Sequence, residues 1–256
     1  MEISLTTIIG AALAIGLRVS GLMLFAPFFS STVIPPQVKA VLTLALTAIL
    51  YPGYAQEITA TSLSHWPLVF VGELVIGVGM GIVSNLVFEA AQLAGQVLSI
   101  QVGYSLVNIL DPTTQVESTV IGAFHQTLVM LIFLSLNVHQ WIIRAVARSF
   151  EYLPPGSATI TASFTQTVIH QGAVILATGV QLAAPVLAAT LLTDIVLGLL
   201  SKASPQLPVM LLGTAVKSML GLGVLAGAIR FWPGLFEQYF RESIRITEQI
   251  FHLART

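Results

Sequence analysis

Long apolar runs alternate with short polar connections along most of the chain. A helix that crosses the hydrocarbon core of a bilayer needs about 20 mainly apolar residues. The pattern therefore predicts an all-α membrane protein with about six apolar helical segments, arranged as helical hairpins. These segments are Leu5–Phe29, Val38–Leu50, Trp66–Phe88, Val120–Ile143, Val168–Leu200 and Pro208–Trp232. The second is short for a span, so an interfacial or re-entrant segment is an alternative there.

The last part of the chain has a different pattern. After Pro233, charged residues such as Glu237, Arg241 and Glu248 recur among apolar ones. This pattern predicts an amphipathic C-terminal helix over residues 233–256, which would lie on membrane lipid or on a partner protein. Proline and glycine mark the connections between the earlier segments, which we expect to be turns.

Composition supports a membrane protein. Hydrophobic residues make up 55% of the chain and charged residues only 8%, with a mean hydropathy of +0.91, whereas soluble domains carry about 25% charged residues. The net charge of −1 provides no basic surface for nucleic acid. Cysteine is absent, which excludes disulfides, thiolate metal sites and cysteine nucleophiles.

Ionisable residues interrupt four of the apolar runs. A charge near the middle of a helix in lipid costs at least about 2.5–3.5 kcal/mol. The side chains of Arg18, Glu73, Asp194 and Lys217 should therefore face other helices or an aqueous path. We expect these buried charges to serve packing and assembly.

Two of these charges lie at matching positions around a predicted turn. If the last two runs form a hairpin that turns at Pro205 and Gln206, Asp194 precedes the turn by as many residues as Lys217 follows it. The spacing predicts an ion pair about 17 Å from the turn, although each charge could instead meet a different helix or a water-lined cavity. Arg18 and Glu73 form a second possible pair, with contacts to partner subunits as the alternative.

The centre of the chain combines small residues with a predicted break in the helix. Ala91, Gly95, Ser99 and Gly103 recur every four residues, which predicts a smooth stripe that permits close helix packing. Beyond Gly103 the helix is expected to give way to a loop. That loop either lines or closes a conduit, or is an ordinary aqueous loop. The glycines of Gly77-Val-Gly79-Met-Gly81 lie inside an apolar helix, so they predict helix packing and not phosphate binding.

Motifs of catalytic chemistry are missing. The histidines show no spacing typical of a metal site, and the sequence has neither a Gly-x-Ser-x-Gly motif nor a phosphate-binding loop. We therefore expect neither an enzyme nor a bound cofactor or metal, and an intramembrane enzyme is a remote alternative. A proton-coupled secondary transporter that uses the buried charges is the main alternative function, but the chain shows no clear inverted repeat.

Short motifs in a fixed order connect these features to a known family. They are Arg18, Ala26-Pro27-Phe28, Ile34-Pro35 with Lys39, the segment Glu89–Gly103 followed by Asp111-Pro112, Leu136–His139, Ser149-Phe150, Leu153–Gly156, Ala184-Pro185 and Pro205-Gln206. Each is weak alone, but their order and spacing cover almost the whole chain. Together they resemble the FliR family, subunits of the flagellar type III protein-export gate.

The resemblance implies a function and partners that composition does not. Proteins of this family assemble with FliP-like and FliQ-like subunits, and with an FlhB-like subunit, in the bacterial inner membrane within the flagellar basal body. The resemblance divides the chain into a FliP-like part over residues 1–160, a FliQ-like hairpin over 161–232 and the amphipathic tail over 233–256. Unfolded flagellar proteins would pass through the channel to which this subunit contributes.

The resemblance also assigns a role to the segment after the small-residue stripe. It corresponds to a plug loop that helps to close the channel to ions when no substrate is present. The residues in this position are Gly103, Tyr104, Leu106, Val107, Ile109, Leu110, Asp111 and Pro112. Their bulky side chains would exclude water, and proline would stiffen the return of the loop.

Overall fold

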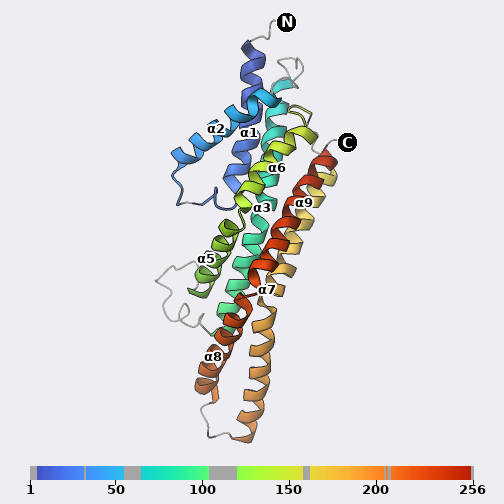
Figure 1. Cartoon of the computed structure of the whole chain (residues 1–256). Coiled ribbons are helices and arrows are strands. Elements are labelled where there is room, and N and C mark those ends of the chain that lie inside the picture. The colour runs from blue at the N-terminus through green and yellow to red at the C-terminus, as the bar shows by residue number, and fades with distance from the viewer. Residues whose placement is uncertain are drawn as a thin grey trace. The chain divides into compact units, whose positions relative to one another are not determined.

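The computed structural model describes residues 5–31, 33–54, 65–103, 120–157, 162–204, 206 and 209–254. These residues form helices joined by short connections, and they contain no strand (Figure 1). The predicted all-α class is therefore confirmed. The helices are α1 (Leu5–Phe25), α2 (Pro36–Tyr54), α3 (Trp66–Val102), α5 (Val120–Ser135), α6 (Val138–Tyr152), α7 (Ala162–Ala203), α8 (Val209–Ile229) and α9 (Trp232–Ala254).

Three helices in the described part are long and apolar enough to cross a membrane, namely α1, α3 and α7. The number rises to five if the pairs α5–α6 and α8–α9 each count as one interrupted span. Helix α2 is not among them, in agreement with the short second run. The apolar helices make the chain a membrane protein.

The fourth predicted run is wrong as a single segment. Residues Val120–Ile143 do not form one helix, because α5 ends at Ser135 and α6 begins at Val138. Asn137 between them has a φ of 56°, in the left-handed region, which a continuous right-handed helix cannot include. Helix α6 is amphipathic, with Ile142 and Phe150 buried and Arg144 exposed.

The described chain divides into two compact units. Unit 1 comprises Met1–Leu86, Leu136–Gly172 and Tyr239–Thr256, and unit 2 comprises Val87–Ser135 and Ala173–Gln238. Each unit therefore combines segments that are distant in the sequence. Helices α3, α7 and α9 each contribute residues to both units.

Glycine permits close packing of α1 against α3 in unit 1, where the two helices run side by side (Figure 1). A Cβ atom on Gly77 would overlap the carbonyl oxygen of Arg18, and one on Gly81 would lie 2.8 Å from Cβ of Phe25. Likewise, a Cβ on Gly21 would lie 2.8 Å from the carbonyl oxygen of Leu74. The predicted packing role of the glycines in the α3 motif is confirmed at Gly77 and Gly81.

Helix α9 packs on α3 within unit 1 through one buried hydroxyl. Ser243 Oγ donates a hydrogen bond of 2.8 Å to the carbonyl oxygen of Val83. Along α9, Phe236 and Phe240 are buried, whereas Arg241 and Arg245 are exposed. The predicted amphipathic C-terminal helix is thus confirmed.

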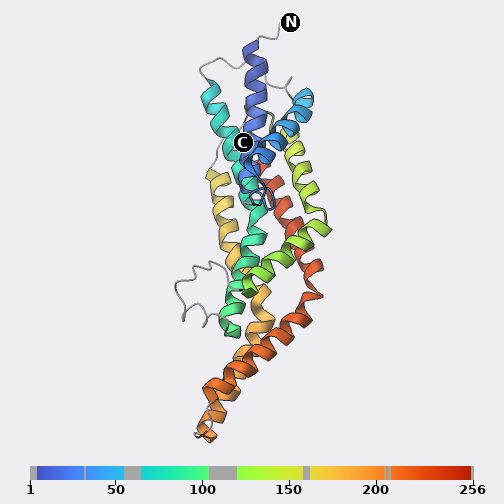
Figure 2. The same cartoon turned by 90° about the vertical axis from the view of Figure 1, so that its left-hand side faces the viewer.

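Unit 2 contains α8 and the part of α7 from Ala173 onward. The two helices form a hairpin and run next to each other in both views (Figures 1 and 2). A Cβ on Gly213 of α8 would lie 2.9 Å from Leu197 of α7. The small-residue stripe of α3 also packs here, because a Cβ on Gly95 would lie 2.9 Å from Cα of Gly122 on α5. Close approach at this stripe was predicted from the sequence.

Candidate functional site: two intramolecular charge pairs

The first charge pair lies in the core of unit 1 and joins α1 to α3. Arg18 Nε donates to Glu73 Oε2 at 2.6 Å, and both side chains are 0% exposed. A buried charge is strongly destabilising unless it is paired and its remaining polar atoms are hydrogen-bonded. The surroundings of the pair must therefore supply those further partners.

Helix α6 and the residues after it supply partners for the guanidinium group. Arg18 Nη1 donates to Ser149 Oγ at 3.1 Å, and Nη2 donates to the carbonyl oxygen of Leu153 at 3.0 Å. The hydroxyl of Ser149 donates in turn to the carbonyl oxygen of Val146 at 2.7 Å. All three nitrogens of the guanidinium therefore have an acceptor.

A tight turn supplies the partner for the carboxylate. The N–H of Ser157 donates to the carbonyl oxygen of Pro154 at 3.1 Å, and Gly156 has a φ of 89°. Proline followed by glycine with positive φ is the signature of a type II turn. The turn directs the N–H of Gly156 to Glu73 Oε1, at 2.9 Å.

An aromatic ring completes the surroundings of the guanidinium. Arg18 Cζ lies 4.1 Å from the centroid of Phe150, a residue that is itself fully buried. A cation over a desolvated ring is stabilised by roughly 2 kcal/mol. The buried pair thus connects α1, α3, α6 and the turn after α6 within unit 1.

The second charge pair joins α7 to α8 and has a different environment. Lys217 Nζ donates to Asp194 Oδ2 at 2.7 Å, while the side chains remain 20% and 46% exposed, respectively. The equal spacing about the hairpin turn predicted this ion pair, and the structure confirms it. Of the two predicted turn residues, Gln206 lies in a turn, whereas Pro205 lies outside the described residues.

Large apolar side chains are also exposed on the hairpin that carries the second pair. On α7, Leu191, Ile195 and Leu199 are 56%, 60% and 64% exposed, and on α8 Met219 is 77% exposed. Scattered exposed leucines are normal on a soluble surface, but a continuous apolar surface indicates lipid or a partner. A partly exposed charge pair on the same hairpin is costly in hydrocarbon, which favours a protein partner there.

The end of α3 is fixed by α8 inside unit 2. Ser218 Oγ donates to the carbonyl oxygen of Val102, the last residue of α3, at 2.7 Å. Gly103 follows with a φ of 93°, and a Cβ at this position would lie 3.1 Å from Thr214. Gly103 is the first residue of the predicted plug loop; the others, Tyr104 to Pro112, lie outside the described residues.

Sequence patterns identified the charged residues but not all of their partners. Arg18 and Glu73 were predicted as a possible pair, and the structure brings them together. The bonds that Arg18 donates to Ser149 and Leu153, and the bond that Gly156 donates to Glu73, were not predicted. A proline–proline–glycine turn directly after an amphipathic helix was the available signal. It does not reveal which distant residue the turn approaches.

Comparison with known proteins decides the family. A model of the family described as "Bacterial export proteins, family 1" matches residues 9–243. The chain belongs to this family. It is similar to the flagellar biosynthetic protein FliR of Escherichia coli (strain K12), with 27% identity over 236 residues, 91% of this chain and 90% of that protein.

Two further relatives extend the similarity across distant bacteria. The export protein is 26% identical to the flagellar biosynthetic protein FliR of Bacillus subtilis (strain 168) over 84% of each chain. It is 24% identical to that of Aquifex aeolicus (strain VF5) over 90% of each chain. The resemblance to FliR derived from short motifs is confirmed, and the protein is a component of flagellar export.

Proposed function

We propose that this export protein is a structural and gating subunit of the flagellar type III protein-export channel. It forms part of the pore through which unfolded flagellar proteins leave the cytoplasm. Its partners are FliP-like and FliQ-like subunits, together with an FlhB-like subunit, in the bacterial inner membrane within the flagellar basal body. Family membership supports the export role, and the finer assignment comes from the motifs described above.

The exposed charge pair on the α7–α8 hairpin carries the proposal. Asp194 and Lys217 lie among apolar side chains that are more than half exposed, such as Leu191 and Ile195. Lipid would leave this partly desolvated pair without additional partners. Neighbouring subunits of the gate would cover both the apolar surface and the charges. This hairpin falls within residues 161–232, the part proposed to correspond to FliQ.

Closure of the channel is assigned to the segment that begins at Gly103 and ends at Gln115. Support comes from the residue directly before it, since the bond from Ser218 to Val102 fixes the point at which the segment leaves α3. Residues 1–160, which include this loop, form the part proposed to correspond to FliP.

The first charge pair gives little support to the alternative function, a proton-coupled secondary transporter. A residue that carries protons must exchange them with water, yet Arg18 and Glu73 are 0% exposed. Their polar atoms are also bonded to Ser149, Leu153 and Gly156. This arrangement is typical of a fixed structural contact.

Co-purification tests the proposed function. The chain would be expressed with and without its FliP-like and FliQ-like neighbours and purified in mild detergent. We expect one large complex from the co-expression and an unstable chain from the single expression. A stable particle that forms without these neighbours, and that transports a solute after reconstitution, would contradict the proposal.

A further inference from the structure

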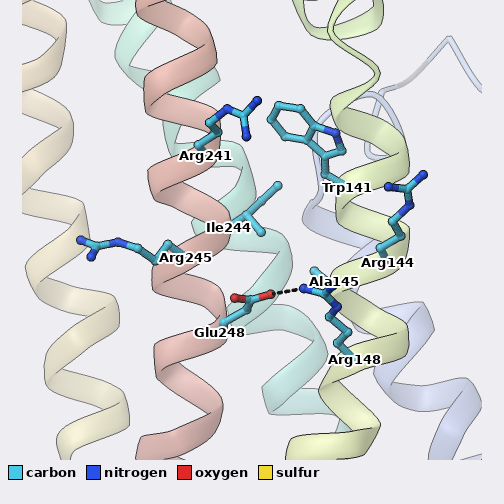
Figure 3. Close-up of a pocket in the computed structure, with 8 residues that line it drawn as sticks. All are labelled: Trp141, Arg144, Ala145, Arg148, Arg241, Ile244, Arg245 and Glu248. Carbon is cyan, nitrogen blue, oxygen red and sulfur yellow. Dashed lines mark hydrogen bonds and ion pairs between the residues drawn. The ribbon is translucent and has the colours of Figure 1, made fainter.

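Four of the chain's ten lysine and arginine residues line a single groove in unit 1. The groove lies between α6 and α9 and encloses about 310 Å³, within the usual size range of ligand pockets. Its complete lining is Trp141, Arg144, Ala145, Arg148, Arg241, Ile244, Arg245 and Glu248 (Figure 3). Only 8% of the residues in this chain are charged, yet four arginines lie together around this groove.

The arginines stand around the groove and not at its floor. Figure 3 shows Arg241 directed toward Trp141 and Arg148 directed toward Glu248, while the ends of Arg144 and Arg245 extend outward on opposite sides. The Arg241 guanidinium lies 4.9 Å from the Trp141 ring centroid, and Arg148 Nη1 lies 3.4 Å from Glu248 Oε1. Arginines on flexible stems can turn toward a ligand, although binding then fixes rotamers that were free.

Positive charge exceeds negative charge around this groove. Its lining has four guanidinium groups and one carboxylate, that of Glu248. Arg144 and Arg148 are four residues apart on α6, as Arg241 and Arg245 are on α9, and like charges at this spacing repel. Arg144 makes no ion pair with any other residue that the structure describes. An anionic ligand would add to the carboxylates that already offset part of this charge, Glu248 for Arg148 and Glu242 for Arg245.

Arg245 has a carboxylate partner on its own helix. Its Nη2 donates to Glu242 Oε1 at 2.6 Å and its Nε donates to Glu242 Oε2 at 2.9 Å. Both side chains are well exposed, and exposed ion pairs contribute little free energy. Arg148 is likewise paired, with Glu248, but the four guanidinium groups of the lining still outnumber its one carboxylate.

The floor of the groove is apolar. Ala145 and Ile244 form it, and the Trp141 ring stands beside them. A ligand that matches the whole groove therefore carries an anionic group next to an apolar part. A free phosphate would leave the apolar floor uncovered, and so would an acidic peptide without apolar side chains.

The position of the groove along the chain indicates a lipid. Helices α6 and α9 follow the apolar helices α5 and α8 after breaks of two residues each. Amphipathic helices next to apolar ones are typical of the membrane–water boundary, where tryptophan and arginine are also enriched. Basic pockets in this position bind the head groups of anionic lipids.

We propose that the groove between α6 and α9 binds the phosphate group of an anionic phospholipid. Guanidinium groups from both helices contact the phosphate oxygens, while Trp141, Ala145 and Ile244 contact the glycerol and the start of an acyl chain. Arginine is suited to this task because its planar donors match phosphate in a bidentate manner. The proposal does not depend on the export role.

Native mass spectrometry tests the proposal on the full chain, purified in mild detergent with whatever subunits it retains. The probes are dioleoyl phosphatidylglycerol, dioleoyl phosphatidylcholine and inorganic phosphate. The test variant is Arg144→Gln/Arg241→Gln, with one change on each helix. Arg230→Gln is the matched control, because Arg230 is exposed and lies outside the groove.

We expect the wild type and Arg230→Gln to retain phosphatidylglycerol but not phosphatidylcholine. Binding by the double variant should fall by about tenfold or more, since removal of one charge-assisted hydrogen bond corresponds to about a factor of ten. Added salt should weaken binding, because the attraction between exposed charges is screened. Both substituted side chains are exposed, so helicity and elution volume should not change.

Three results would overturn the proposal. The first is equal phosphatidylglycerol binding by the double variant and Arg230→Gln. The second is binding of inorganic phosphate without any preference for phosphatidylglycerol over phosphatidylcholine, which would assign the groove to free phosphate. The third is capture of an acidic segment of a co-purified subunit, and not of lipid, by a photo-crosslinker placed at Ala145.

Discussion

The backbone N–H of Gly156 donates a hydrogen bond to the Glu73 carboxylate at 2.9 Å, across a sequence separation of 83 residues. This bond depends on a glycine with a φ of 89°. The turn between α6 and α7 is therefore part of the environment of a buried ion pair, and its conformation should affect the stability of unit 1.

Substitution of Gly156 by alanine should destabilise the protein. A Cβ atom there would meet only Val69 at 3.7 Å, an ordinary contact, so the destabilisation would come from the backbone conformation. A non-glycine residue with such a φ costs about 1–2 kcal/mol. Thermal unfolding of the purified complex in detergent measures the effect.

The matched control for this prediction is Gly223→Ala in α8. Gly223 lies in a helix, and a Cβ there would meet nothing within 4 Å. Alanine should stabilise that helix by roughly 0.5–1 kcal/mol. Equal melting temperatures for Gly156→Ala and Gly223→Ala would contradict the strain argument.

Removal of one partner from the buried pair should destabilise much more than removal of both. Arg18→Met leaves the Glu73 carboxylate buried and unpaired, which costs about 3–5 kcal/mol. Arg18→Met/Glu73→Leu removes both charges and should recover most of that stability. Protease resistance of the complex, as a function of denaturant, compares the two variants. A double variant as unstable as the single one would show that the pair's hydrogen bonds to α6 matter more than charge balance.

The hairpin pair should tolerate exchange of its charges. Asp194→Lys or Lys217→Asp places like charges where the structure has an ion pair of 2.7 Å, and each should reduce recovery of the complex. The double exchange restores the attraction and should restore recovery. Because the pair is partly exposed, its own contribution is about 1 kcal/mol or less. If the double exchange performs no better than the single reversals, partner residues and not the pair determine recovery.

Deletion of Ser105–Leu110 should make assembled gates leak ions. The deleted residues include most of the bulky side chains assigned to closure by the FliR resemblance. Single-channel conductance of the reconstituted complex measures the leak, with full-length gates of the same preparation as control. Unchanged conductance in correctly assembled gates would remove the closure role from this segment.

Sequence patterns predicted the helical class and the main contacts of the charges, for identifiable physical reasons. Apolar length predicted α1, α3 and α7, because hydrocarbon requires long apolar segments. Asp194 and Lys217 are the same number of residues from the hairpin turn, and this spacing predicted the bond between them. Because each helical residue advances by a constant rise, equal spacing places both residues at the same distance from the turn.

The sequence did not predict features that depend on contacts between distant segments. The break at Asn137 was missed because the residues on both sides are apolar, and only tertiary packing decides that α6 buries Phe150 and exposes Arg144. The bond from Arg18 to Ser149 and the bond from Gly156 to Glu73 were missed for a similar reason. The sequence of a turn predicts the conformation of that turn, but it does not predict which distant residue the turn will contact.

The hydroxyl of Ser218 has a consequence for sequence variation in the hairpin. It satisfies the last carbonyl of α3 from the residue directly after Lys217, the residue that pairs with Asp194. An insertion or deletion in the connection between α7 and α8 would move α8 by about 1.5 Å per residue and rotate it. Such a change would break the ion pair and uncap α3 at once. The length of this connection should therefore be among the least variable lengths in the chain.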